Sequence, residues 1–150
     1  MLERFERFLS AISEIDRYWH KIAGDEMARY GLKGPHATYL VAIRRHPEGL
    51  TAGQLGECCG RDKADVSRTM ATLEKKGLVI KEEVGASLYR GVYRLTEEGL
   101  AAAGHVCQRA SLAVELADKD LTEESRAAFY TALESIVVNL RKLSEEGLPQ

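Results

Sequence analysis

The stretch Asp62-Lys-Ala-Asp-Val-Ser-Arg-Thr-Met-Ala-Thr-Leu-Glu-Lys-Lys-Gly-Leu78 decides the fold of this 150-residue chain. Its first aspartate can accept hydrogen bonds from the free backbone N–H groups of a first helical turn. Val66, Met70 and Leu73 follow at spacings of four and three, which puts them on one face of a helix. Gly77 suits the left-handed conformation that ends many helices. The stretch therefore predicts a helix over 62–76 with a buried face and an open face.

Two shorter helices are predicted before this stretch. Pro35 has the fixed φ of a first helical turn and opens a helix through about Arg45. Thr51-Ala-Gly-Gln54 is a capping box, in which the threonine hydroxyl and the glutamine amide satisfy free backbone N–H groups, so a third helix runs to about Cys59. Gly60 and Arg61 then form a tight turn into the decisive stretch.

A β-hairpin is predicted after it. Leu78-Val-Ile-Lys-Glu-Glu83 has β-branched character, Gly85-Ala-Ser87 can turn, and Tyr89–Leu95 returns with apolar residues. Helices, a turn, a further helix and a two-stranded hairpin form the order of a winged helix-turn-helix over residues 35–95. The predicted fold class is mainly α with a small β-hairpin.

Long amphipathic helices flank this module within residues 1–30 and 96–146. Their apolar stripes are Leu2, Phe5, Leu9, Ile12, Ile15, Trp19 and Ile22, then Leu100, Ala103, Cys107, Ala110, Val114 and Ala117, then Phe129, Leu133, Ile136, Val137, Leu140 and Leu143. A winged module of about 60 residues cannot cover these stripes, so we expect a second copy to cover them. We therefore interpret residues 1–150 as one domain that dimerises through its outer helices.

The chain resembles the MarR family of transcriptional regulators. The resemblance is carried by residues 62–78, by Leu50-Thr-Ala-Gly-Gln-Leu55 before them and by Leu95-Thr-Glu-Glu-Gly99 after the wing. It implies a homodimer made by the outer helices, a recognition helix in the major groove and a wing at the adjacent minor groove. It also implies a regulator, more often a repressor, that binds double-stranded DNA at a pseudo-palindromic operator.

The open face of the 62–76 helix supplies the expected DNA contacts. Arg68 can donate two hydrogen bonds to the O6 and N7 of a guanine, and hydroxyls can serve bases or phosphates. Lysines would neutralise backbone charge. The predicted contact residues on this helix are Lys63, Ser67, Arg68, Thr72 and Lys75. The alternative is a solvated charged face on which Arg68 pairs with Asp65 or Glu74.

The wing adds Arg90, with Tyr89 beside it, as a candidate for insertion into the minor groove. Many relatives carry an Asp-x-Arg tip, and this hairpin has no such acidic partner. An ordinary turn arginine is the alternative.

The net charge of −2 is unevenly distributed, with +3 over residues 44–94 and −5 over residues 95–150. The basic middle third agrees with DNA binding, although many solvated surfaces carry as much charge. The rival hypothesis is a winged-helix module that binds a protein partner without an operator, with the acidic last third as its surface.

The resemblance also implies an effector pocket between the outer helices and the winged module. Trp19, Tyr30, His36 and Tyr39 could line an apolar cavity with polar handles for a small aromatic or lipophilic molecule. The alternative is that these rings are core, as aromatics at helical spacing usually are.

Other chemistry finds little support in the sequence. Three cysteines, Cys58, Cys59 and Cys107, form no C-x-x-C pair, and the four histidines have no metal-ligand spacing, so no metal site and no disulfide is expected. No catalytic constellation or phosphate loop appears, so neither an enzyme nor a cofactor is predicted. Without a signal peptide or a long apolar run, we expect a cytoplasmic protein that does not enter a membrane.

Overall fold

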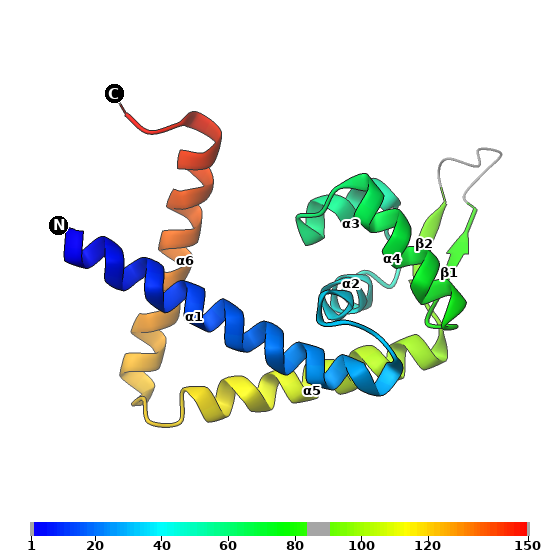
Figure 1. The fold of residues 1–150 in the computed structure, drawn as a ribbon, viewed down its shortest axis with the longest axis horizontal. Coiled ribbons are helices and arrows are strands. Elements are labelled where there is room, and N and C mark those ends of the chain that lie inside the picture. The colour runs from blue at the N-terminus through cyan, green and yellow to red at the C-terminus, as the bar shows by residue number, and fades with distance from the viewer. Residues whose placement is uncertain (1, 84–90, 150) are drawn as a thin grey trace. The chain divides into compact units, whose positions relative to one another are not determined.

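The computed structural model describes residues 2–83 and 91–149. It divides into two compact units, residues 1–110 and residues 111–150 (Figure 1). The helices and strands, in chain order, are α1 (Leu2–Met27), the 3-10 turn η1 (Ala28–Tyr30), α2 (Gly34–Arg44), α3 (Ala52–Cys59), α4 (Lys63–Lys75), β1 (Val79–Glu82), β2 (Val92–Leu95), α5 (Glu97–Ala117) and α6 (Glu123–Glu146). The predicted fold class, mainly α with a small hairpin, is confirmed.

The caps expected from the sequence form as predicted. Thr51 and Gln54 make the reciprocal capping box of α3, with a hydrogen bond from Gln54 N to Thr51 Oγ1 of 3.2 Å. Asp62 Oδ1 accepts a hydrogen bond from the backbone N–H of Asp65 at 2.8 Å and so begins α4. The starts of α3 and α4 are therefore both set by local sequence.

Gly77 ends α4 in a Schellman motif. Its φ is +73°, its N–H donates to the carbonyl of Glu74 at 2.9 Å, and the N–H of Leu78 donates to the carbonyl of Leu73 at 3.0 Å. These two bonds satisfy carbonyls that the last turn would otherwise leave free. Leu73 and Leu78 are both buried, so the end of the helix is fastened to the core.

The sheet is a two-stranded antiparallel hairpin with one added bridge. Val79 lies opposite Leu95 and Glu82 lies opposite Val92. On its other side, β2 exchanges two backbone hydrogen bonds with Leu50, of 2.7 and 3.1 Å between Leu50 and Tyr93. This bridge ties the wing to the segment before α3, and the sequence did not predict it.

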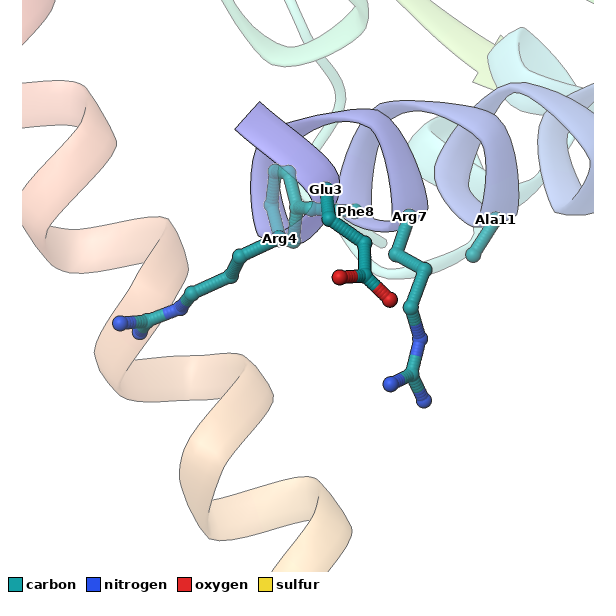
Figure 2. A pocket seen from close by; sticks show the side chains of 5 residues that line it. All are labelled: Glu3, Arg4, Arg7, Phe8 and Ala11. Atoms are coloured by element: carbon teal, nitrogen blue, oxygen red, sulfur yellow. The ribbon is translucent and has the colours of Figure 1, made fainter. Parts of the chain in front are cut away.

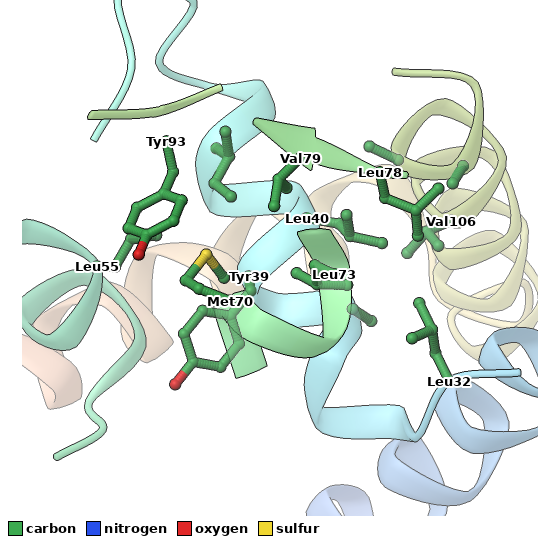
Figure 3. Close-up of a cluster of buried hydrophobic side chains, with 14 of the residues drawn as sticks. Leu32, Tyr39, Leu40, Leu55, Met70, Leu73, Leu78, Val79, Tyr93 and Val106 are labelled. Atoms are coloured by element: carbon green, nitrogen blue, oxygen red, sulfur yellow. The ribbon is translucent and has the colours of Figure 1, made fainter. Parts of the chain in front are cut away.

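One hydrophobic core supports the module (Figure 3). Its buried members come from the end of α1 through the middle of α5: Met27, Leu32, Ala37, Tyr39, Leu40, Ile43, Leu50, Leu55, Val66, Met70, Leu73, Leu78, Val79, Tyr93, Ala102, Ala103 and Val106. The predicted inward face of α4, Val66, Met70 and Leu73, is confirmed as fully buried. Helix α4 therefore stands on this core by one face only.

Helix α5 places only part of its predicted apolar stripe against the core. Its buried residues are Gly99, Ala102, Ala103 and Val106, whereas Leu100 is exposed. The reason lies at Gly99, where a β-carbon would overlap the carbonyl oxygen of Leu78. The close backbone approach rotates the helix so that glycine and alanine face the core. Ala103 of the predicted stripe is therefore fully buried, whereas Leu100 of the same stripe lies on the surface of the single chain.

The second unit consists of the end of α5 and the whole of α6. Thr122 caps α6, accepting from the N–H of Ser125 at 3.1 Å. Arg126 reaches back across the connection, with its Nε 2.9 Å from Asp118 Oδ2 and its Nη1 2.7 Å from Glu123 Oε2. These ion pairs fix the turn between the two helices.

Helices α1 and α6 leave large apolar side chains at the surface of the single chain. On α1 the exposed residues are Leu2, Phe5, Phe8, Leu9, Ile12, Ile15, Tyr18, Trp19 and Ile22, and on α6 they are Phe129, Tyr130, Ile136, Val137, Val138, Leu140 and Leu143. Met27, at the end of α1, is fully buried. None of the helices in the described part of the chain is long and apolar enough to cross a membrane.

Candidate nucleic-acid interface

The face of α4 that points away from the core carries the predicted contact residues. Lys63, Ser67, Arg68 and Lys75 are exposed, and Thr72 is half-buried. The hydroxyl of Thr72 donates to the carbonyl oxygen of Arg68 at 3.0 Å. All five predicted side chains thus lie on α4. The hydroxyl proton of Thr72 is already used in a hydrogen bond within the helix.

Arg68 is strongly exposed and has a partner on its own helix. Its side chain is 73% exposed, and its Nη2 lies 3.7 Å from Oδ1 of Asp65, one turn earlier on α4. The pairing that the sequence left as an alternative is therefore present. An exposed ion pair of this length is worth little, roughly 0.2–1 kcal/mol, so the guanidinium can still be offered to another acceptor.

Asp65 has a second, shorter partner across the fold. The hydroxyl of Tyr39, on α2, donates to Oδ2 of Asp65 at 2.6 Å. The ring of Tyr39 is fully buried beside Met70, and its oxygen points out of the cluster (Figure 3). Burial, with help from the Asp65 carboxylate, raises the pKa of Tyr39 well above its usual value. The phenol therefore stays protonated and remains a donor to Asp65.

The described part of the wing carries its own charges. Arg94 Nε lies 3.0 Å from Glu82 Oε2 on the neighbouring strand, and Lys81 Nζ stands 5.6 Å from the centre of the Tyr93 ring. Both contacts join β1 to β2 at the base of the hairpin. The candidate wing contact Arg90 and its neighbour Tyr89 lie outside the described residues.

The four effector candidates do not share one setting. Trp19 is 40% exposed on α1, whereas Tyr39 is fully buried with its hydroxyl bound to Asp65. Tyr30 packs edge-on against His105 with ring centres 6.2 Å apart. The Nδ1 of His36 accepts a hydrogen bond from the backbone N–H of Lys33 at 3.1 Å, and burial lowers the pKa of His36.

A surface cavity lies away from these four rings. Figure 2 shows its lining, which comes entirely from the first turns of α1: Glu3, Arg4, Arg7, Phe8 and Ala11. It includes none of the predicted effector residues. It is a hollow between charged side chains on one helix.

A charged cluster that sequence reasoning missed joins α1 to α5. Glu26 Oε1 lies 2.9 Å from Arg109 Nε, its Oε2 lies 3.0 Å from His105 Nε2, and Arg29 stands 3.7 Å away. Hydrogen bonds from Arg109 and then His105 lower the pKa of Glu26. Glu26 lies 79 positions from His105 and 83 positions from Arg109, so no local spacing could have revealed these two contacts.

The cysteines lie in separate settings. Cys58 is exposed, while Cys59 packs against the core, where burial raises its pKa to about 11. The Sγ of Cys107 accepts a hydrogen bond from Arg44 at 3.4 Å. Among the residues that the structure describes, no three metal-ligating side chains come together.

Comparison with known families matches residues 30–87 to the MarR family. The matched segment begins in η1 and covers α2, α3, α4 and β1. It therefore contains the whole exposed face of α4 described above. No curated protein gives a sequence match to the chain.

Solved structures share the fold over nearly the whole chain. A protein from Listeria monocytogenes described as a MarR family transcriptional regulator, crystallised with a 26mer DNA, is 23% identical with a TM-score of 0.81, covering 95% of this chain and 96% of that one. A MarR transcriptional regulator from Methanosarcina mazei Go1 is 23% identical with a TM-score of 0.81 and 92% coverage of both chains. MepR, a transcription regulator of the Staphylococcus aureus multidrug efflux pump MepA, is 18% identical with a TM-score of 0.68, covering 87% of this chain and 96% of MepR. These likenesses show a common fold.

Proposed function

We propose that the protein is a DNA-binding transcriptional regulator of the MarR family, whose model matches residues 30–87. The observation that carries the proposal is the exposed face of α4. Its donors stand on a helix that is capped by Asp62, ended by Gly77 and fixed to the core by Val66, Met70 and Leu73. A helix held in this way can enter the major groove without losing its own order.

The side chains on that face suit contacts to both the bases and the phosphates of DNA. Arg68 is the group that would read a base, since a guanidinium can donate two parallel hydrogen bonds to guanine. Lys63 and Lys75 stand at the two ends of the helix and would neutralise phosphates on either side. Ser67 and Thr72 would add hydroxyl contacts. We keep Arg90 as a proposed contact of the wing.

We propose that the regulator acts as a homodimer. The support is the row of exposed apolar side chains on α1 and the similar row on α6, since monomeric proteins rarely expose so much contiguous apolar surface. A two-fold dimer would present two α4 helices to successive turns of duplex and so bind an inverted repeat. This role for residues 1–30 and 96–146 completes the proposed organisation of residues 1–150 as one domain in the cytoplasm.

We further propose that the regulator is a repressor relieved by a small aromatic or lipophilic effector. Trp19, Tyr30 and His36 have solvent-accessible surface and remain the proposed lining of the effector pocket. Tyr39 is buried, so it would only pack behind that lining. A ligand can change DNA affinity only by favouring one of two dimer conformations. Thermal shift against aromatic acids and lipophilic cations tests this part, and silence across the panel would count against it.

The main proposal is tested by selecting duplexes from a random library with the full chain. The selected duplex is then titrated at two ionic strengths. Binding that weakens steeply with added salt, at an inverted repeat, is the expected result, because several counterions leave the duplex when lysines and arginines bind. Failure to bind any duplex at low salt would overturn the proposal and favour a protein-binding winged module.

A further inference from the structure

Arg68 is linked to the core through two other residues, Asp65 and Tyr39. The buried hydroxyl of Tyr39 holds Oδ2 of Asp65 at 2.6 Å, and Oδ1 of the same carboxylate lies 3.7 Å from Arg68 Nη2. The side chain of Asp65 is 31% exposed, so it sits at the border between core and surface. Its two oxygens therefore face two different groups, one buried and one in solvent.

The position of the carboxylate is fixed before any ligand arrives. The ring of Tyr39 is immobilised in the core beside Met70, and the backbone N–H of Asp65 is bound to Asp62. An ordinary surface ion pair gains little because two flexible side chains must be ordered together. Here only Arg68 remains to be ordered, which favours guanidinium positions within reach of Asp65.

That restraint bears on what Arg68 can bind. A bidentate contact to guanine uses two of the five N–H donors of the guanidinium and demands a fixed plane. A phosphate contact needs no particular base and brings a second negative group toward Asp65, which costs electrostatic energy. The fixed carboxylate therefore penalises use of Arg68 on the backbone more than use of Arg68 on a base edge.

We infer that Asp65, held by Tyr39, is a specificity-determining residue of this helix. It positions Arg68 for base recognition and lowers binding to DNA of unrelated sequence. The inference rests on the proposed function, because it assigns a role within the same DNA-binding face. A purely structural role, in which Asp65 only satisfies the Tyr39 hydroxyl, would affect stability and leave sequence discrimination unchanged.

The test uses the full chain with a duplex that the wild-type protein selects from a random library and a scrambled duplex of equal length. Asp65→Asn keeps an oxygen that can accept from Tyr39 and removes the charge beside Arg68. We expect it to bind the scrambled duplex about 3- to 10-fold more tightly, with a salt dependence steeper by roughly one phosphate contact. Its preference for the selected duplex should fall by a similar factor.

Two further variants separate positioning from net charge. Tyr39→Phe leaves every charge in place and frees the Asp65 carboxylate, so a reduced preference for the selected duplex is expected without a change in net charge. Asp62→Asn removes a carboxylate from the same helical turn and keeps a good N-cap residue. It should shift binding to both duplexes equally and leave their ratio unchanged. Melting curves establish that each variant is folded.

The outcomes are distinct. If the wild-type protein prefers its selected duplex and both Asp65→Asn and Tyr39→Phe keep that preference, the inference is overturned while the proposed function stands. If Asp62→Asn lowers the preference as much as Asp65→Asn, net charge accounts for the effect and the inference is again overturned. If the wild-type protein shows no preference between duplexes, the proposed function itself fails.

Discussion

The hydroxyl of Thr96 donates a hydrogen bond of 2.6 Å to the carbonyl oxygen of Gly77, nineteen positions earlier in the chain. The same oxygen of Thr96 accepts from the N–H of Gly99 at 3.0 Å and so begins α5. One side chain therefore joins the end of α4 to the start of α5. Strands β1 and β2 lie between Gly77 and Thr96 in the sequence.

Replacing Thr96 should loosen that junction. Thr96→Ala removes the cap of α5 and leaves the Gly77 carbonyl without its donor, so we expect a loss of about 0.5–2 kcal/mol in the free energy of unfolding. Urea denaturation measures it. Thr96→Ser keeps the hydroxyl and should recover most of the loss. Equal destabilisation by both variants would show that the methyl group, rather than the hydrogen bonds, matters.

Gly99 should tolerate no side chain. Gly99→Ala would drive a β-carbon into the carbonyl oxygen of Leu78, with an expected cost of roughly 1–3 kcal/mol or more. Gly104 lies on the same helix, and a methyl group added there would meet no atom within 4 Å. Gly104→Ala should therefore be neutral or stabilising by up to about 1 kcal/mol. Thermal or urea unfolding of the two variants measures these changes in stability. Similar effects at both sites would contradict the predicted clash at Gly99.

Removing Arg68 should cost both affinity and discrimination. For Arg68→Ala we expect binding to the selected duplex to weaken by roughly 1–3 kcal/mol, with relaxed preference at one base in each half-site. Competition among duplexes with single base changes measures this. Uniform weakening across all sequences would instead make Arg68 a phosphate contact.

Charging the apolar face of α1 should separate the proposed dimer. Ile12 belongs to the exposed row on that helix, and Ile12→Asp would place a carboxylate where a second copy is expected to pack. Sedimentation at micromolar concentration should then show monomers. Ser10 lies on the opposite side of α1, so Ser10→Asp should remain dimeric. A wild-type chain that sediments as a monomer would remove the proposed explanation of the apolar row.

Acid should weaken the joint between α1 and α5 at Glu26. The folded-state pKa of Glu26 lies below its ordinary value of 4.5, because Arg109 and His105 bind the charged form. The stabilisation is therefore present above that ordinary value and is lost as the pH falls through the lowered pKa. Urea midpoints measured across about pH 3–7 should depend less on pH in Glu26→Gln than in the wild-type protein. Glu6→Gln, on the exposed surface of α1, should behave as the wild-type protein does.

Local signals in the sequence predicted the caps, the helix order and the inward face of α4, because each depends on residues within one or two turns. Thr51, Asp62 and Gly77 are examples. The contacts that couple distant segments could not be predicted in this way. The Leu50–Tyr93 bridge, the Glu26 cluster and the bond between Tyr39 and Asp65 arise only when the packed core brings those segments together.

The candidate site shows the same division. Helical periodicity identified which α4 residues face outward, because once the buried positions are known the residues on the opposite side of the helix must face solvent. It could not show that Asp65 is anchored from α2, because no spacing rule links positions 26 residues apart. The burial of Tyr39, predicted as an effector residue with core as the alternative, likewise depends on its packing against α4.

The contact between Gly99 and Leu78 has a mechanical consequence. Where two backbones are in direct contact, neither can move toward the other, and close-packed interiors transmit strain between them. With Thr96 bonded to Gly77 beside it, the start of α5 and the end of α4 move as one rigid corner. We therefore expect a change in the direction of α5 to be transmitted to α4, the proposed recognition helix, as a rotation of the whole corner.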